Sequence, residues 1–124
     1  MSLLLDSNVL LWWLFNHPRL NAAAIAAIKA DDTPLVSLVS PWELWIKAAA
    51  GKLQLPDDLE QGIRDDGFTI LTPTLADARL AARLPPIHRD PFDRMIVAHA
   101  LNRQATVVTS DRHFADYGVD VLQV

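Results

Sequence analysis

The sequence contains no cysteine and no long apolar run, and each absence excludes whole classes of protein. Without cysteine there is no disulfide scaffold, zinc ribbon, iron–sulfur site or thiol nucleophile. No apolar run exceeds seven residues, as in residues 9–15, whereas roughly 20 are needed to cross a bilayer. The first residues lack the basic start of a signal peptide, and Asp6 interrupts their apolar stretch. We therefore expect a soluble cytoplasmic protein with no membrane partner.

Positive charge and glycine-rich phosphate loops are also scarce. The chain has 11 basic and 15 acidic residues and a formal net charge of -4, which argues against binding nucleic acid or anionic lipid through overall charge. The motifs GxGxxG, GxxxxGK[ST] and GxSxG do not occur, so dinucleotide binding, a P-loop NTPase and an α/β-hydrolase lack support. The spacing of the histidines matches no zinc-binding motif, so we expect them to have structural or surface roles. These histidines are His17, His88, His99 and His113.

The chain does contain short apolar runs that alternate with helical patterns. Its length of 124 residues, with 51% hydrophobic and 21% charged residues, indicates a single globular domain over residues 1–124. Strands that are apolar on both faces and alternate with helices predict a mostly parallel five-stranded sheet in a three-layer α/β/α sandwich. The predicted strands are residues 3–5, 35–39, 68–71, 106–109 and 119–124. The predicted helices are residues 21–30, 40–50, 56–64, 74–83 and 90–103.

Four acidic residues occur where an α/β fold binds its ligands, beyond the carboxyl ends of strands and at the starts of helices. Asp6 follows the first predicted strand, and Asp111 follows the fourth. Glu43 and Asp93 each lie on the first turn of a predicted helix. Although these acids are far apart in sequence, the geometry of strand ends can bring all four into one cleft.

Each acid also has a simpler structural explanation. Ser40 and Glu43 match a capping box, and Glu43 precedes Lys47 by four residues. An acid at a helix start favours the helix dipole, and a lone aspartate after a strand is commonly a turn residue. Apolar neighbours, however, predict that several of these carboxylates are partly buried, and no lysine follows Lys52 to compensate them. Carboxylates that share one cleft repel one another. A Mg²⁺ or Mn²⁺ ion with oxygen ligands would offset this repulsion and would support phosphodiester hydrolysis.

Small polar residues next to the acids are candidates for holding water or phosphate. Ser7 and Asn8 follow Asp6, and Ser110 precedes Asp111. The alternative is that they are ordinary turn residues, because Ser and Asn commonly accompany Asp in turns.

Four segments, in this order, resemble the PIN-domain ribonucleases and especially the VapC-type toxins of type II toxin–antitoxin systems. Residues 3–12 (LLLDSNVLLW) look like the family's opening strand with its first catalytic aspartate. Residues 40–47 (SPWELWIK) resemble the segment that carries the family's glutamate. Residues 88–100 (HRDPFDRMIVAHA) and 107–111 (VVTSD) resemble the segments with the third and fourth acids. The similarity covers nearly the whole chain.

The resemblance implies a Mg²⁺- or Mn²⁺-dependent endoribonuclease that cuts structured or messenger RNA. It also implies a cognate VapB-like antitoxin as inhibitor and a homodimer. In this family Asp6 and Asp93 would bind the metal directly, and Asp111 would bind it or hold a ligand. Glu43 would orient water or bind a second metal. Asp90 either assists this site or serves only as the N-cap of its helix.

Two positions depart from the family pattern. Ser7 stands where the family more often has threonine, and it retains the hydroxyl. His99 stands where the subfamily often has glutamine, which leaves the role of this position open. Neither departure affects the four acids.

Charged and aromatic residues predict two partner surfaces. Residues 79–113 contain six arginines and three acids, a net charge of +3 against -7 for the rest of the chain. RNA phosphates would meet the arginines near the cleft, unless these only solvate helix faces. These arginines are Arg89, Arg94 and Arg112. An apolar groove for the antitoxin is predicted at four tryptophans, with at least one of the first two in the core. They are Trp12, Trp13, Trp42 and Trp45.

Two other functions remain as alternatives. A phospho-receiver domain has similar length and topology but requires an aspartate after the third strand and a lysine after the fifth. Here Thr72 and Pro73 follow the third predicted strand, and the late chain has no lysine. The second alternative is a catalytically inactive PIN scaffold that only binds RNA or a partner protein, against which the presence of all four acids argues.

Overall fold

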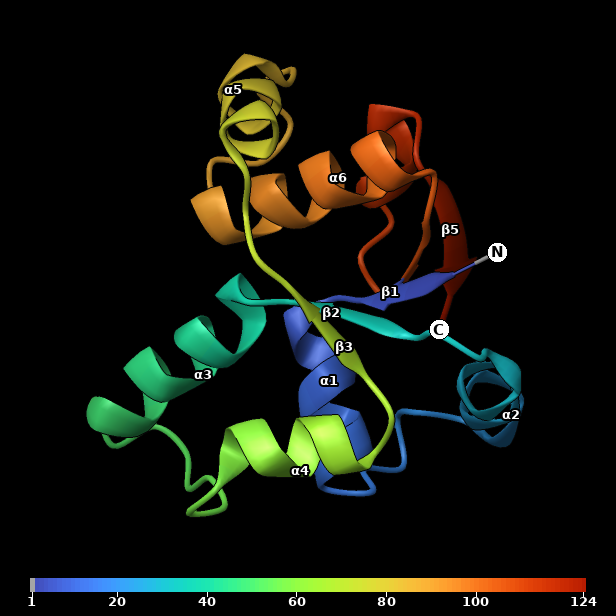
Figure 1. Cartoon of the computed structure of the whole chain (residues 1–124), viewed down its shortest axis with the longest axis vertical. Helices are drawn as coiled ribbons and strands as arrows, with labels where there is room; N and C mark the ends of the chain where they lie inside the picture. The colour runs from blue at the N-terminus through green and yellow to red at the C-terminus, as the bar shows by residue number, and fades with distance from the viewer. Residues whose placement is uncertain (1) are drawn as a thin grey trace.

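The computed structural model describes residues 2–124 as a five-stranded sheet with helices on both sides (Figure 1). The strands are β1 (Leu3–Leu5), β2 (Leu35–Ser37), β3 (Thr69–Leu71), β4 (Thr106–Thr109) and β5 (Asp120–Gln123). The helices are α1 (Ser7–Leu14), α2 (Ala22–Ala30), α3 (Val39–Ala49), α4 (Leu59–Asp65), α5 (Leu75–Arg83), α6 (Pro91–Arg103) and the short 3₁₀ helix η1 (Phe114–Tyr117). The strand order is β3-β2-β1-β4-β5 with every pair parallel, so the predicted parallel sandwich is confirmed.

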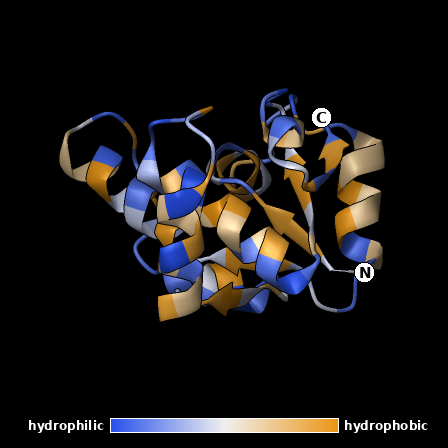
Figure 2. Ribbon diagram, turned by 90° about the horizontal axis from the view of Figure 1, so that it is seen from above, coloured by the Kyte–Doolittle hydropathy of each residue, from blue (hydrophilic) through white to orange (hydrophobic). Residues whose placement is uncertain are grey.

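The central strands separate two apolar cores, because successive side chains of a strand point to opposite faces. Leu4 packs with Ile96 of α6 on one face, whereas Leu5 packs with Val9 of α1 and Ile28 of α2 on the other. Figure 1 shows α5 and α6 on the first side and α1, α2 and α4 on the second. The central strands are correspondingly apolar in Figure 2, as expected for strands that are buried on both faces.

The strands β1 and β4 are neighbours at the point where the order of strand addition across the sheet reverses. From β1 the chain proceeds through β2 to β3, and it then returns to place β4 and β5 on the other side of β1. Leu5 pairs with Val108, and the Asp6 N–H donates to the Val108 carbonyl at 3.1 Å. Ligands of open α/β sheets bind beyond the carboxyl ends of strands at such a reversal. Asp6 and the residues after β4 lie at this position.

Helix α3 begins earlier than the sequence predicts. Its first residue is Val39, whose N–H donates to Ser37 Oγ at 3.2 Å. Ser40 is therefore buried inside the first turn, where its hydroxyl accepts a hydrogen bond from Ser7 at 3.0 Å. The prediction that Ser40 caps this helix and forms a capping box with Glu43 is wrong, because a tertiary contact occupies the serine.

The other differences are smaller. The helix predicted from residue 56 begins at Leu59, because the Asp58 side chain caps it by accepting the Gln61 N–H at 3.2 Å. The prediction did not include η1. No helix within residues 2–124 is long and apolar enough to span a membrane.

Candidate active site

Asp6 joins the end of β1 to the start of α1. As the N-cap of α1, it accepts the Val9 N–H at 2.8 Å through Oδ1. Its other oxygen, Oδ2, accepts the Thr109 hydroxyl of β4 at 2.5 Å. The residue is only 4% exposed. A capping role and a position at the strand junction thus fix this carboxylate at the carboxyl edge of the sheet.

Burial dominates the electrostatics of Asp6 and raises its pKa from an ordinary 3.8 to about 6. The hydrogen bonds from Thr109 and Val9 favour the charged form and offset part of this effect. The negative charges of Asp111 and Glu43 raise the pKa further, although they contribute less. The carboxyl group therefore titrates near neutral pH while the site lacks a compensating cation.

Asp93 lies on the first turn of α6, which Asp90 caps by accepting the Phe92 N–H at 2.8 Å. The predicted N-cap role of Asp90 is confirmed. Burial, followed by the charges of neighbouring acids, raises the pKa of Asp93 to about 7. These acids are Asp90, Glu43, Asp6 and Asp111, in order of decreasing effect. The repulsion shows that the four acids singled out in the sequence come together in space.

Glu43 contributes a partly buried carboxylate from α3. Its Oε2 lies 3.4 Å from Nζ of Lys47, one turn further along the helix. Its Oε1 is buried and has no hydrogen-bond partner among residues 2–124. A buried acceptor without a donor costs free energy, so this oxygen lacks the partner that a cation or a bound water would supply.

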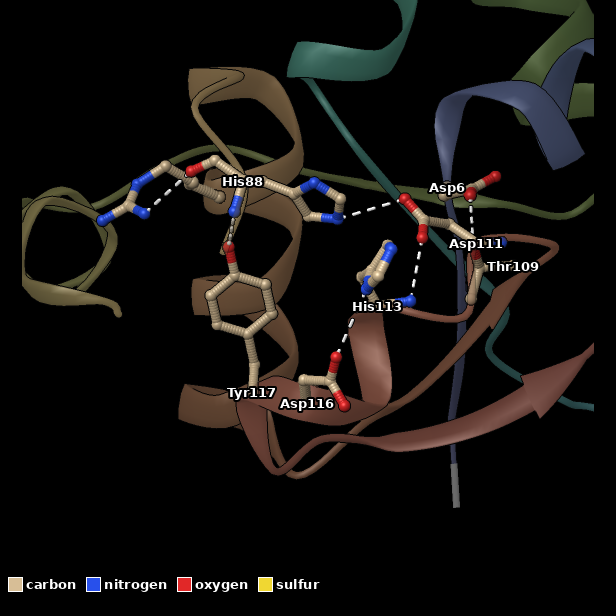
Figure 3. A network of polar contacts seen from close by, with 8 residues as sticks. Asp6, His88, Thr109, Asp111, His113, Asp116 and Tyr117 are labelled. Carbon is tan, nitrogen blue, oxygen red and sulfur yellow. Dashed lines mark hydrogen bonds and ion pairs between the residues drawn. The ribbon is translucent and has the colours of Figure 1, made fainter. Parts of the chain in front are cut away.

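Asp111 follows β4, and its side chain is 32% exposed, against 15% for the side chain of Glu43. Its N–H donates to Thr109 Oγ1 at 2.9 Å, and its Oδ1 accepts the His113 N–H at 2.8 Å. Its Oδ2 lies 3.1 Å from Nε2 of His88. Figure 3 shows these contacts as a continuous set that extends from His88 through Asp111 to Thr109 and Asp6.

The four acids are electrostatically coupled but do not yet enclose an ion. Within residues 2–124, no group of three or more histidine, aspartate or glutamate side chains is already arranged to hold a metal. Asp6 has hydrogen bonds to both oxygens, whereas Oε1 of Glu43 has none. The backbone therefore brings the acids together, and the side-chain rotamers leave the site open.

The small polar residues near the acids differ in their surroundings. Ser7 is buried and donates to Ser40, which links α1 to α3. Asn8 is exposed on the first turn of α1, and Ser110 is partly buried between Thr109 and Asp111. The hydroxyl of Ser7 therefore already has a structural use.

Arg94, one of the predicted RNA contacts, has a structural role in the folded chain. Its guanidinium donates to four backbone carbonyls in and next to the segment between α5 and α6. These acceptors are Ala81, Leu84, Pro85 and His88, at 2.8 to 3.1 Å. This guanidinium therefore holds the segment in place, and an RNA contact by Arg94 stays a prediction. Arg89 and Arg112 are exposed near the site and remain predicted RNA contacts.

The four tryptophans do not form one groove. Trp12 and Trp13 line a hollow of about 500 Å³ between α1 and α2, whereas Trp45 lines a separate hollow of about 210 Å³. Trp42 is 51% exposed and packs edge to face against Phe92, with ring centroids 5.0 Å apart. The single predicted groove is therefore corrected to two hollows and one exposed ring.

Sequence reasoning missed two residues of this site, Thr109 and His88. Thr109 contacts Asp6 across the β1–β4 pair, one position beyond the paired Leu5 and Val108. An alignment of the two predicted strand ends is a signal that could have identified it. His88 was assigned a structural or surface role, and no pattern in the sequence connects it to Asp111.

Comparisons with known proteins agree with this geometry. The family model of the PIN domain matches residues 3–120. Ribonuclease VapC22 of Mycobacterium tuberculosis (strain ATCC 25618 / H37Rv) is 33% identical, over 94% of this chain and 92% of that protein. The crystal structure of VapBC2 from Rickettsia felis bound to a promoter DNA fragment has a TM-score of 0.74 at 17% identity, covering 99% of this chain and 98% of that one. A toxin–antitoxin complex from Klebsiella pneumoniae has a TM-score of 0.69 at 21% identity, covering 98% and 97%. The chain belongs to the PIN domain family.

Proposed function

We propose that this chain, a single domain over residues 1–124, is a Mg²⁺- or Mn²⁺-dependent endoribonuclease and the toxin of a toxin–antitoxin pair. The observation that carries the proposal is that burial and the charges of neighbouring site acids raise the pKa of Asp6 to about 6 and that of Asp93 to about 7. Strongly perturbed carboxylates at a sheet edge are typical of functional sites. The relative with 33% identity is a ribonuclease, which supports RNA as the substrate.

The donor set fits a hard divalent cation. Asp6, Asp93, Asp111 and Glu43 offer oxygen ligands, which Mg²⁺ and Mn²⁺ prefer. The buried Oε1 of Glu43 has no partner, and a cation or its water would supply one. The described side chains do not already form a group of three ligands, so side chains of the site would have to move to bind the ion. When bound, the metal would lower the pKa of a water and offset charge on the phosphate.

The chain's own residues prepare this chemistry. The Thr109 hydroxyl and the Val9 N–H orient Asp6 and favour its ionised form. Oε1 of Glu43 is the acceptor that would orient the attacking water in line with the scissile bond. Exposed Arg89 and Arg112 are assigned to the flanking RNA phosphates, which they would contact through salt-sensitive interactions.

The proposed partners are a VapB-like antitoxin and a second copy of this chain. The Klebsiella pneumoniae relative was solved as a toxin–antitoxin complex. Here the hollow at Trp12 and Trp13 and the hollow at Trp45 are candidate seats for an apolar antitoxin segment. A small reading frame directly upstream would supply the antitoxin for binding measurements. A Trp45→Ala variant that bound this antitoxin as tightly as the wild type would remove the second seat.

The two alternatives differ in their standing. A phospho-receiver domain is excluded, since the chain belongs to the PIN domain family. An inactive PIN scaffold would not need carboxylates whose ionised forms are destabilised, because such groups cost stability without serving a reaction. The experiment below separates that scaffold from an enzyme.

The test is RNA cleavage by the purified chain with Mn²⁺, with Mg²⁺ or with EDTA, beside Asp6→Asn and Asp93→Asn variants. We expect chelation to abolish cleavage and each substitution to lower the rate by more than about 100-fold, since even residues that only support a metal ligand contribute about 10- to 100-fold. Asp120→Asn is the matched control, because Asp120 is an exposed aspartate at the amino end of β5. Cleavage that survives EDTA and both substitutions would refute the mechanism.

A further inference from the structure

The imidazole of His88 lies against Asp111, and neither the proposed metal binding nor the proposed RNA binding uses it. Its Nε2 is 3.1 Å from Oδ2 of Asp111, and the histidine side chain is only 16% exposed (Figure 3). The nitrogen is buried, and its angle to the carboxylate does not satisfy a hydrogen bond in this arrangement. His88 is thus a nearly enclosed polar group whose nearest partner is a carboxylate of the candidate site.

The backbone of His88 is fixed on both sides. Its N–H donates to the Tyr117 hydroxyl at 2.6 Å, and its carbonyl accepts from Arg94 Nη1 at 3.1 Å. Arg94 also donates to Ala81, Leu84 and Pro85, so one guanidinium organises the whole segment before α6. This segment therefore presents the imidazole in a defined position.

The His88 ring is held as firmly as its backbone. The ring packs against Phe114 and Tyr117, with centroids 5.5 and 5.9 Å away, and both aromatic residues are buried in η1. Figure 3 shows the His88 ring pointing toward the carboxylate of Asp111.

The contact at Asp111 continues to the first site acid. Oδ1 of Asp111 accepts the His113 N–H, and the Asp111 N–H donates to Thr109 Oγ1. The Thr109 hydroxyl in turn donates to Oδ2 of Asp6. A displacement of Asp111 would therefore affect Thr109 and Asp6 as well.

We propose that His88 is a positioning residue that holds Oδ2 of Asp111 in the orientation needed to bind the divalent cation. The inference rests on the proposed function, and it assigns this role to the segment that precedes α6. Carboxylates that bind metals are oriented by hydrogen-bond donors behind them, and the loss of such a donor typically costs about 10- to 100-fold in metal affinity. The alternative is that His88 only fills space between Asp111 and the rings of η1.

His88→Leu and His88→Gln separate these roles. Leucine keeps an apolar side chain against Phe114 and Tyr117 but removes the donor, whereas glutamine keeps an N–H donor with similar reach. Mn²⁺ binding to the full chain without RNA is measured by calorimetry, beside thermal unfolding and Mn²⁺-dependent RNA cleavage. His17→Leu is the matched control, because His17 is an exposed histidine at the hollow of Trp12 and Trp13.

We expect His88→Leu to weaken Mn²⁺ binding about 10- to 100-fold, and His88→Gln to restore most of the affinity. His17→Leu should bind Mn²⁺ as the wild type does. Tyr117→Phe is a milder variant that removes only the acceptor of the His88 N–H, and it should weaken Mn²⁺ binding by a few-fold. This variant keeps the inference testable even if leucine at position 88 prevents folding.

Three results would overturn the inference. Wild-type Mn²⁺ affinity in His88→Leu would show that His88 only packs, and equal losses in the leucine and glutamine variants would show that its donor is unimportant. With both histidine variants unfolded, unchanged Mn²⁺ affinity in Tyr117→Phe would have the same consequence. In these three cases the wild-type chain still cleaves RNA, so the proposed function stands. A wild-type chain that binds no Mn²⁺ would refute both the proposed function and the role of His88.

Discussion

Asp6 and Asp77 are both almost completely buried, at 4% and 1% exposure, but their carboxylates have different partners. Asp77 lies in the first turn of α5 and accepts hydrogen bonds from Arg103 and Asn102 of α6. It also completes a capping box with Thr74. Asp6 has one hydroxyl and one backbone N–H as partners, and no cationic side chain contacts it in the described part of the chain.

The pKa values follow this difference in partners. For Asp77, burial alone would raise the pKa, but the hydrogen bonds from Arg103, Asn102 and Thr74 outweigh it and lower the pKa well below the ordinary range. For Asp6, burial outweighs the two hydrogen bonds and raises the pKa to about 6. A buried carboxylate that the protein compensates is part of the scaffold, whereas one that it leaves uncompensated is available to a ligand.

His99 lies beside Asp77, but neither nitrogen of its own ring has a hydrogen-bond partner within residues 2–124. Its ring is fully buried, and its Nδ1 lies 3.4 Å from Oδ2 of Asp77. Burial lowers the pKa of His99, although the charge of Asp77 opposes this effect. The role that the sequence left open at this position is therefore a contact between α5 and α6, on the side of the sheet away from α1.

Replacement of Asp77 gives the largest change in stability that this comparison predicts. Asp77→Ala removes the capping box and leaves Arg103 and Asn102 without their buried acceptor. We expect a loss of about 3 kcal/mol in the free energy of unfolding, toward the lower end for a buried pair because Arg103 is 29% exposed. Urea unfolding measures it, with the exposed Asp65→Ala as control. A change below about 1 kcal/mol would contradict the structural assignment of Asp77.

Much of the fold follows from local sequence. The apolar runs predict all five strands because both faces of the sheet are covered, and Asp90 with Pro91 predicts the start of α6 because local hydrogen bonds determine a cap. The start of α3 could not be predicted in the same way. Ser40 matches the local pattern, but its partner is Ser7 on another helix, so a tertiary contact decides its role.

The acids of the candidate site were predictable for a related reason. Asp6 directly follows one predicted strand and Asp111 follows another after Ser110, and strand ends of a parallel sheet share one edge. The supporting residues were not predictable, since their contacts join distant parts of the chain. Thr109 contacts Asp6 across 103 positions, and Arg94 holds a segment whose folded path no local pattern specifies.

The second prediction concerns stability against pH in the metal-free protein. The pKa values of Asp6 and Asp93 are about 6 and about 7 in the folded chain, against 3.8 ordinarily, so between these values the folded state binds more protons than the unfolded state. Stability must then fall as pH rises. We expect a loss of about 1 to 2 kcal/mol between about pH 5 and about pH 8, less than the full shifts imply because Asp93 is partly exposed to solvent.

Thermal or urea unfolding across this pH range, in EDTA, measures the loss. Asp93→Asn should flatten the slope and stabilise the metal-free chain at the higher pH, and Mn²⁺ should stabilise the wild type most at that pH. Asp77 provides the contrast. Its pKa is lowered, so its contribution is complete across this range and is lost only under strong acid. Stability that rose between these pH values would contradict the assignment of Asp6 and Asp93 as uncompensated acids.

The smallest predicted effect concerns the single hydroxyl that partly compensates Asp6. Thr109→Val removes this donor, and also the acceptor of the Asp111 N–H, with little change in shape, so the pKa of Asp6 should rise further above about 6. More of the carboxyl would then be protonated at neutral pH, and a proton competes with a cation for the same oxygen. For a rise of about one pKa unit, we expect Mn²⁺ affinity to fall about twofold near pH 7 and close to tenfold at about pH 5, where the proton competes throughout.

Thr109→Ser is the matched control for this substitution, because it keeps the hydroxyl and should keep most of the affinity. The loss in Thr109→Val should also shrink as pH rises, since Asp6 is then ionised with or without the hydrogen bond. Calorimetric titration with Mn²⁺ at several pH values distinguishes this from structural damage, which would lower the affinity equally at every pH. A loss of Mn²⁺ affinity that does not depend on pH would mean that Thr109 only positions Asp6 and does not lower its pKa. The contrast between the pKa values of Asp6 and Asp77 would then explain less of their difference in role.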